Sequence, residues 1–271
     1  MVLLYMACGA GTFDLLVPQD GSMVASYKEV RRDIAMPTDQ LIPVTSTGQV
    51  CSKWGVHNRL AIVAETYKGG EAAFITNIGH LIVPNATRDT PANTWTCEGM
   101  GSHAGQMQAA QRVGCHYGSV ASTGVGGRIA DAVAAVVSPT YVVNSWSAAG
   151  SNVFGDSSSV KREIVGDGVK HFREYSTWQW ELQNISTQKH ANPYANVYTF
   201  ALMDALQVPV TVDDLISSVG ALKHTWGICI GVCAQFKAVA KLISARADRN
   251  VERDVFSTGA SWHPSRISGA R

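Results

Sequence analysis

Residues 175–206 read YSTWQWELQNISTQKHANPYANVYTFALMDAL, and this stretch predicts two helical segments. Trp178 and Trp180 stand two residues apart in the first segment. On a helix their side chains would point about 200° from each other, so they cannot share one buried face. We therefore expect at least one of the two indoles to meet a partner, either an adjacent helix or a neighbouring chain.

The second segment, 194–207, is apolar except for one acidic residue, Asp204. Apolar residues occupy the stripe that holds Asp204 and also the next stripe, so we expect this helix to be buried on most sides. An ionised carboxylate in such surroundings is costly without a cation. Arg173 and Arg246 are the candidate cations, and the sequence predicts a structural ion pair for Asp204.

Helical spacing of apolar residues extends over the rest of the chain after Trp95. Thr211 and Asp214 form a near capping box, which predicts a helix start at that point. Asp156 and Ser157 could cap another helix. The predicted helical stretches outside 194–207 are HAGQMQAAQRV, GRIADAVAAVVS, SVKREIVGDGVKHFREYSTWQWELQ, TVDDLISSVGALK and ICIGVCAQFKAVAKLISARADR.

Short apolar runs between turn residues predict strands from Thr12 to about Trp95. KGGE at 68–71 is a candidate hairpin connection between two of these runs. We predict an α+β chain with a β-rich N-terminal region at 1–95, a mainly helical core at 96–254 and an extended C-terminal arm at 255–271. The runs predicted as strands are FDLLV, LIPV, RLAIVAETY, AAFITN and GHLIV.

Charged residues make up only 16% of the chain and the net charge is +1. This balance argues against a dedicated polybasic binder of nucleic acid or membranes. The charge is uneven, because residues 237–271 hold seven Lys and Arg against three Asp and Glu, a net charge of +4. Such a segment can neutralise phosphates, although it could equally be a solvated helix face. The candidate phosphate-binding residues there are Lys237, Lys241, Arg246, Arg249 and Arg253.

The six cysteines are too scattered for a disulfide scaffold and predict reduced, mostly buried thiols in an intracellular compartment. Cys229 and Cys233 are four residues apart, so we expect both on one helix face as small packing residues. The N-terminal apolar run lacks the basic residues of a signal peptide. No run approaches the length of a membrane span.

Three sets of residues could take part in catalysis or ligand binding. NVFGDSSSV at 152–160 places Ser157 as a candidate nucleophile, which would need a histidine base such as His80 or His116. GVGGRIADAVAAVV at 124–137 begins like a phosphate-binding glycine turn, with a flexible helix start as the alternative. Cysteine and histidine residues supply zinc-type ligands at spacings that fit no common structural zinc site, and we predict no metal or cofactor. These residues are Cys97, His103, Cys115 and His116.

The C-terminal half resembles the core of coat proteins of flexible filamentous plant RNA viruses, the potexvirus-like group. The matching elements appear in the same order as in that family. They are Arg173 in HFREY, Trp178 and Trp180 in TWQW, Phe200 to Leu206 in FALMDAL, Arg246 in SARAD and Arg266 in SRISGA. The resemblance implies a helical core that grips one RNA strand and arms that link neighbouring subunits. It also implies that Arg173 and the basic residues near Arg246 touch phosphate, while Asp204 holds an arginine in position.

The resulting expectation is a non-catalytic, self-assembling coat or nucleocapsid protein that packages single-stranded RNA. Such a protein would be found in the virion or in the cytoplasm of the host cell. A serine hydrolase with Ser157 as its nucleophile is one alternative. A scaffold that assembles without nucleic acid is another.

Overall fold

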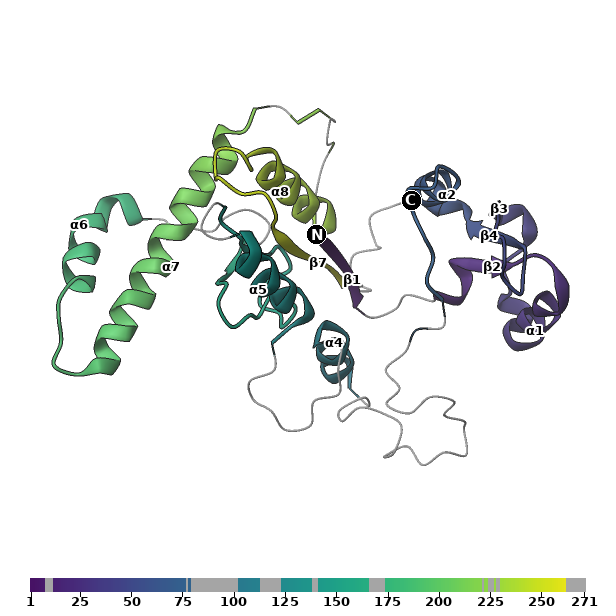
Figure 1. Ribbon diagram of the computed structural model, residues 1–271, viewed down its shortest axis with the longest axis horizontal. Coiled ribbons are helices and arrows are strands. Elements are labelled where there is room, and N and C mark those ends of the chain that lie inside the picture. The colour runs from purple at the N-terminus through teal and green to yellow at the C-terminus, as the bar shows by residue number, and fades with distance from the viewer. Residues whose placement is uncertain are drawn as a thin grey trace. The chain divides into compact units, whose positions relative to one another are not determined.

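The computed structural model describes residues 1–7, 12–76, 78, 102–112, 123–137, 141–165, 174–220, 222–223, 227 and 230–261 (Figure 1). The chain divides into two compact units. The smaller unit is Gly9–Gly79, and the larger unit combines Met1–Cys8 with His80–Arg271. Both units contain helices and strands, so the predicted α+β class is confirmed.

The smaller unit is built on a three-stranded antiparallel sheet of order β2-β4-β3. Its core joins Val44 and Val56 to Ala64 on a helix, with Trp54 packed beside them. The strands are β2 (Leu16–Pro18), β3 (Leu41–Thr45) and β4 (Lys53–His57), and the helices are α1 (Gly21–Arg31) and α2 (Ala61–Lys68). Short 3₁₀ helices lie at Thr12–Asp14, Arg32–Ile34, Thr38–Gln40 and Asn58–Leu60.

The strand predictions for this unit are confirmed in part. FDLLV and LIPV overlap β2 and β3, but residues 72–76 of AAFITN form no strand. GHLIV, at 79–83, lies outside the described residues. RLAIVAETY supplies most of α2 rather than a strand. Leu60, Ala64 and Tyr67 explain the difference, because their helical spacing places all three against the sheet core. The predicted hairpin at KGGE is also wrong, since Gly69 caps the C-terminus of α2. Strand β4 was not predicted, and its Gly55 lets Leu41 of β3 approach so closely that a Cβ would lie 2.8 Å from the Leu41 Cβ.

The larger unit contains a parallel sheet of order β1-β7-β5-β6. Its strands are β1 (Val2–Ala7), β5 (Ser145–Ser147), β6 (Arg162–Ile164) and β7 (Val255–Ser261). Its helices are α4 (His103–Arg112), α5 (Val125–Val137), α6 (Tyr175–Ser186), α7 (Pro193–Ser218) and α8 (Val232–Ser244). Parallel strands need crossover connections, and helices pack on this sheet accordingly.

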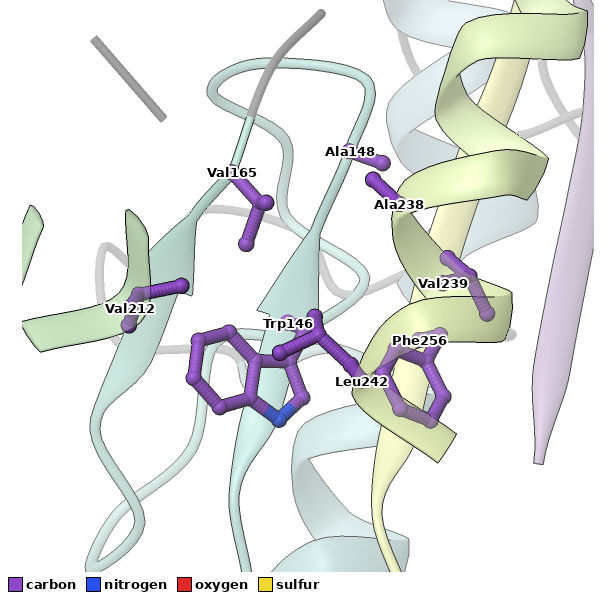
Figure 2. Packing of buried hydrophobic residues seen from close by; sticks show 8 residues of the cluster. All are labelled: Trp146, Ala148, Val165, Val212, Ala238, Val239, Leu242 and Phe256. Atoms are coloured by element: carbon purple, nitrogen blue, oxygen red, sulfur yellow. The ribbon is translucent and has the colours of Figure 1, made fainter. Parts of the chain in front are cut away.

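Each face of this sheet has its own buried cluster. Trp146 and Phe256 pack with Val212 of α7 and with Leu242 of α8, and Figure 2 shows the Trp146 indole lying between Val212 and Leu242. Val255, one residue before Phe256, belongs to a different cluster with Ala130 of α5 and with Phe154. Neighbouring strand residues point to opposite faces, so α8 and α5 cover opposite sides of β7.

The helix predictions for this unit were right for α4 and α5 and partly wrong elsewhere. The stretch 159–183 divides into β6 and the start of α6. The two segments expected at 194–207 and 211–223 form one helix, α7, which continues through Pro209. Thr211 and Asp214 therefore do not mark a helix start.

The predicted C-terminal arm is wrong for residues 255–261. These residues form β7, which lies between β1 and β5, and Val255 and Phe256 are buried. β7 pairs with β1 from the other end of the chain, so that β1 belongs to the larger unit rather than to a β-rich N-terminal domain. Residues 262–271 lie outside the described part of the chain.

The two cysteines Cys51 and Cys233 differ in their oxidation state. Cys51 is a buried free thiol that donates to the Asp20 carboxylate at 2.7 Å. Cys233 is disulfide-bonded, so the prediction of reduced thiols is wrong at that position. No helix in the described ranges is both long and apolar enough to span a bilayer.

Candidate assembly and nucleic-acid interface

One side of α7 presents apolar side chains to solvent. Tyr194, Val197 and Tyr198 are 83%, 68% and 69% exposed, and Ala201 beside them is exposed too. We call these four residues the outer face of α7. Their three- and four-residue spacing places them on one side of the helix. Phe200 is 72% exposed as well, but it stands two residues from Tyr198 and points to a different side. The expectation that residues 194–207 are buried on most sides is therefore wrong.

The opposite side of α7 is covered. Thr199 is 8% exposed, Ala195 and Leu202 are half-buried, and α6 packs against α7 (Figure 1). Further along the helix, Val212 is buried in the main core cluster and Ile216 packs against that cluster. The C-terminal part of α7 is thus anchored in the core, while its N-terminal part carries the outer face.

The two tryptophans of α6 do not share a buried face. Tyr175 and Ser186 define the buried side of α6, whereas Trp178 is 47% and Trp180 is 71% exposed. The Trp178 Nε1–H donates to the Glu174 carboxylate at 3.2 Å. Both indoles therefore remain at the surface of this chain, as their two-residue spacing requires of at least one of them.

Arg246 and Arg249 line one cavity of about 540 Å³ at the end of α8, and Arg253 lines it as well. Its apolar part includes Ile129 of α5 and Val255 of β7. Arg246 is exposed, and within the described part of the chain its guanidinium has only a long 3.5 Å hydrogen bond to the Ile243 carbonyl. The structure therefore brings three of the predicted phosphate-binding residues together.

Arg249 is held inside the fold rather than offered to a ligand. Its Nη2 donates to the Asp254 carboxylate at 2.6 Å and to the Leu242 carbonyl at 2.8 Å. Its guanidinium carbon lies 5.4 Å from the centre of the Trp146 ring. The side chains of Arg249 and Asp254 are only 10% and 4% exposed. These contacts are those of a structural ion pair.

Arg253 is the other available cation at this cavity. Its side chain is 69% exposed, and its Nε lies 3.9 Å from the Glu252 carboxylate, which is a weak exposed pair. Asp254 is already neutralised by Arg249. Arg246 and Arg253 together therefore outweigh Glu252, and the rim of the cavity is net positive.

The remaining predicted basic residues lie elsewhere. The Lys241 ammonium donates to the Ile216 carbonyl at 3.0 Å, near the end of α7, where a cation is favoured. Lys237 is half-buried on α8. Arg173 lies outside the described residues, and so does the side chain of Asp204, so the predicted ion pair of Asp204 is not placed.

No protein-family model matches the chain, and no curated protein or solved structure does. The elements that resemble coat-protein motifs can be located in part. The TWQW tryptophans lie on α6, residues 200–206 lie within α7, and Arg246 follows α8. Arg266 lies outside the described residues.

Ser157 lies in a turn that precedes β6. Its hydroxyl donates to the Val160 carbonyl and accepts from the Val160 N–H at 2.7 Å. The candidate bases His80 and His116 both lie outside the described residues. Both described bonds of the Ser157 hydroxyl therefore stabilise the turn.

The glycine turn at the start of α5 is filled by protein backbone. The Gly124 N–H donates to the Asp156 carbonyl and the Gly127 N–H donates to the Phe154 carbonyl, each at 2.9 Å. A Cβ on Gly127 would lie 1.8 Å from the Asp156 carbonyl oxygen. The glycines thus allow close contact between α5 and residues 153–156, and these two N–H groups are not available to a phosphate.

Asp131 of α5 holds the turn that contains Ser157. Its carboxylate accepts the N–H groups of Ser158, Ser159 and Val160 at 2.9, 3.0 and 3.3 Å. Partial burial raises the pKa of Asp131, but hydrogen bonds from the Ser159 hydroxyl and from this backbone outweigh it and lower the pKa to about 2. Sequence reasoning did not predict this residue, because its partners are 27 or more positions away.

We expect Asp131→Asn to destabilise the larger unit at neutral pH. A lowered folded-state pKa stabilises the fold above the ordinary carboxyl pKa of about 4 and loses that contribution as pH falls toward 2. The difference in urea midpoint between wild type and variant should therefore be constant from pH 7 to pH 5 and should shrink below pH 4. Asp248→Asn, at an exposed position outside the turn, is the control. A difference that does not change with pH would contradict the proposed role of the charge.

Proposed function

We propose that this chain is a non-catalytic, self-assembling coat or nucleocapsid protein in which neighbouring copies meet through the outer face of α7. The observation that carries the proposal is the exposure of Tyr194, Val197 and Tyr198 on one side of a helix whose other side is covered. Large exposed apolar patches mark interaction surfaces in proteins that remain in solution. A protein of this kind would act in a virion or in the cytoplasm of a host cell.

The size of the outer face suits a protein partner. Aromatic side chains bury roughly 150–250 Å² each, so the exposed parts of its three largest side chains amount to on the order of 400 Å². A stable interface buries about 800 Å² on each partner. The outer face thus supplies about half of one side of such an interface.

Its charge suits a second copy of the same chain. The outer face consists of Tyr, Val and Ala side chains, and residues 175–206 hold only Glu181, Lys189 and Asp204 as charged residues. A two-fold axis places identical surfaces against each other, and this arrangement is tolerated when the surface carries little charge of one sign. The outer face meets that condition.

The nucleic-acid part of the proposal is supported by Arg246 and Arg253. Both guanidinium groups stand at the rim of one cavity and are exposed. Phosphate contacts of this kind add a salt-dependent term to affinity without sequence preference. Packaging of single-stranded RNA needs no more specificity than that.

Tyr198→Glu is expected to abolish self-assembly without unfolding the chain. A carboxylate at the centre of the outer face would have to lose its hydration on association, which we expect to weaken association at least 100-fold, about 2.7 kcal/mol. Sedimentation velocity over a range of concentrations measures this effect. Ile62→Glu adds the same charge at an exposed apolar helix position in the smaller unit and should assemble like wild type.

Two results would contradict the assembly proposal. One is a wild-type chain that stays monomeric at every concentration, with or without single-stranded RNA. The other is a Tyr198→Glu variant that assembles as well as wild type while its circular dichroism is unchanged.

Arg246→Gln combined with Arg253→Gln is expected to reduce the salt dependence of RNA binding. Each phosphate contact on a single strand contributes about 0.7 to the slope of log K against log salt, so the slope should fall by about 1.4. Filter binding with an unstructured oligonucleotide measures the slope. Lys28→Gln with Lys68→Gln, two exposed lysines of the smaller unit, is the matched control. Particles that form without nucleic acid would instead indicate a pure scaffold.

A further inference from the structure

Strand β1 forms one edge of the parallel sheet of the larger unit. Its inner side pairs with β7 over all six residues, whereas no strand within the described part of the chain pairs with its outer side. An open edge presents a row of backbone N–H and C=O groups to which another strand can bind. The outer side of β1 is therefore a candidate surface for the addition of a strand.

The other three edge strands among the described residues carry features that block such pairing. β6 has three residues, and two of them, Arg162 and Glu163, are charged. In the smaller unit, β2 ends in Pro18 and β3 has Pro43 at its centre, and proline has no N–H to offer. β1 reads VLLYMA and holds neither a charge nor a proline. β1 thus lacks the protection that the other edges have.

The backbone groups of β1 alternate between its two sides. The Met1 carbonyl faces β7, where it accepts the Phe256 N–H at 2.8 Å. Successive residues of a strand direct their backbone groups to opposite sides, so the residues that face β7 are every second one from Met1. The residues between them each direct one N–H and one C=O to the open edge. These residues are Val2, Leu4 and Met6.

The side chains of the same three residues form an incompletely covered apolar strip. Val2 is the cross-strand neighbour of Phe256, so the three side chains lie on the face of the sheet that α8 covers at Phe256. Val2, Leu4 and Met6 are nevertheless 41%, 43% and 49% exposed. A further strand beside β1 would extend the sheet and cover these side chains.

We propose that β1 pairs with β1 of a second copy of this chain, antiparallel and about a two-fold axis at Leu4. The three outward-facing residues are placed symmetrically about Leu4, so the strand is complementary to its own reverse. In this register Leu4 lies opposite Leu4 of the other copy, and Val2 lies opposite Met6. Every outward N–H then meets an outward C=O. Like charges that face each other across strands are destabilising, and a strand without charge avoids them.

This contact is separate from the outer face of α7 and does not rest on the proposed packaging function. One two-fold contact closes a dimer, whereas two different two-fold contacts on each chain allow further copies to join. Growth beyond two copies would then need both contacts. Tyr198→Glu should stop growth and leave the dimer formed through β1. Leu4→Lys should leave the dimer formed through α7.

Leu4→Cys is expected to form a disulfide between two copies under mild oxidation. Residues that exchange hydrogen bonds in an antiparallel pair have Cα atoms about 5.5 Å apart, within the range of roughly 4.4–6.8 Å that a disulfide spans. Val2→Cys should not form one with itself, because the two Val2 residues would lie four positions apart, about 13 Å. A mixture of Val2→Cys and Met6→Cys chains should form the mixed disulfide.

Electrophoresis without reductant, followed by mass spectrometry of the joined peptides, measures these disulfides. The wild-type chain gives the background from its own cysteines. The Leu4→Cys disulfide should also form in a chain that carries Tyr198→Glu, which separates a failure of this contact from a failure of assembly through α7. Equal cross-linking of Leu4→Cys and Val2→Cys, or none of Leu4→Cys above background, would overturn the proposal.

Leu4→Lys is expected to weaken the β1 dimer at least 10-fold, because two ammonium groups would face each other across the axis. Sedimentation velocity in the Tyr198→Glu chain measures the effect without the α7 contact. One strand pair is a small interface, so the dimer should form at micromolar concentration. Ile164→Lys, at an exposed position on the β6 edge of the same sheet, should dimerise like its parent. A Tyr198→Glu chain that stays monomeric at high micromolar concentration would contradict the pairing.

Discussion

Gly127→Ala is expected to lower the free energy of unfolding of the larger unit by about 3 kcal/mol, the upper range for overpacking a filled core. The added Cβ would lie 1.8 Å from the Asp156 carbonyl oxygen, so α5 or residues 153–156 must move. That movement breaks the hydrogen bond from the Gly127 N–H to the Phe154 carbonyl. The gain in helix propensity from glycine to alanine, about 1 kcal/mol, is too small to compensate. Urea unfolding followed by tryptophan fluorescence measures the loss.

Gly220→Ala is the matched control for that variant. A Cβ on Gly220 meets nothing within 4 Å, so this substitution should leave the urea midpoint unchanged or raise it slightly. Equal effects of the two substitutions would show that the contact between α5 and residues 153–156 is looser than described.

Arg249→Ala is expected to destabilise the larger unit by about 3–5 kcal/mol, because removal of one partner leaves the other buried charge uncompensated. Among the described residues, the Asp254 carboxylate would keep only its hydrogen bonds from the N–H and side-chain amide of Asn144. The Trp146 ring would also lose the guanidinium beside it. Differential scanning calorimetry and urea unfolding both measure this loss.

Arg246→Ala provides the comparison, since Arg246 lines the same cavity but is exposed. Its effect on stability should stay within about 0.5 kcal/mol, as for most surface substitutions. The order should be reversed for RNA affinity, which Arg246→Ala should lower more than Arg249→Ala does. A stable Arg249→Ala variant that has lost only RNA affinity would assign Arg249 to the phosphate-binding surface instead.

Local sequence patterns predicted the elements whose secondary structure does not depend on contacts with distant parts of the chain. The α5 segment shows helical spacing over its whole length, and its boundaries were nearly right. RLAIVAETY was misassigned because a short apolar run fits both a strand and a helix, and only its contact with the small sheet decides. The two segments predicted at 194–207 and 211–223 lie largely within one continuous helix, α7, although Pro209 stands between them.

The largest error concerned residues 255–261, whose strand depends on a partner about 250 residues away. Ser257 and Thr258 gave this segment the composition of an arm, but both are buried in β7. No local signal indicates that β1 lies beside it. The parallel arrangement of the sheet was unpredictable for the same reason, since it follows from pairings between distant segments.

The candidate site was predictable only in outline. The sequence placed Arg246 and Arg249 close together, but it could not show that Asp254 and Trp146 immobilise Arg249. Residues 194–207 are unusually apolar, and we predicted from this composition that the helix is buried within its own chain. The same composition is required of a helix that is buried on one side by its own chain and on the other by a neighbour.

Helix α7 is anchored in the core of its own unit at Val212 and exposes Tyr198 about 21 Å earlier along the same axis. Pro209 lies close to the anchored end and lacks the N–H that would complete the helical ladder there. In the proposed assembly, copies that meet through the outer face of α7 would change their mutual angle when the helix bends at Pro209. The same protein interface would then suit particles of more than one radius.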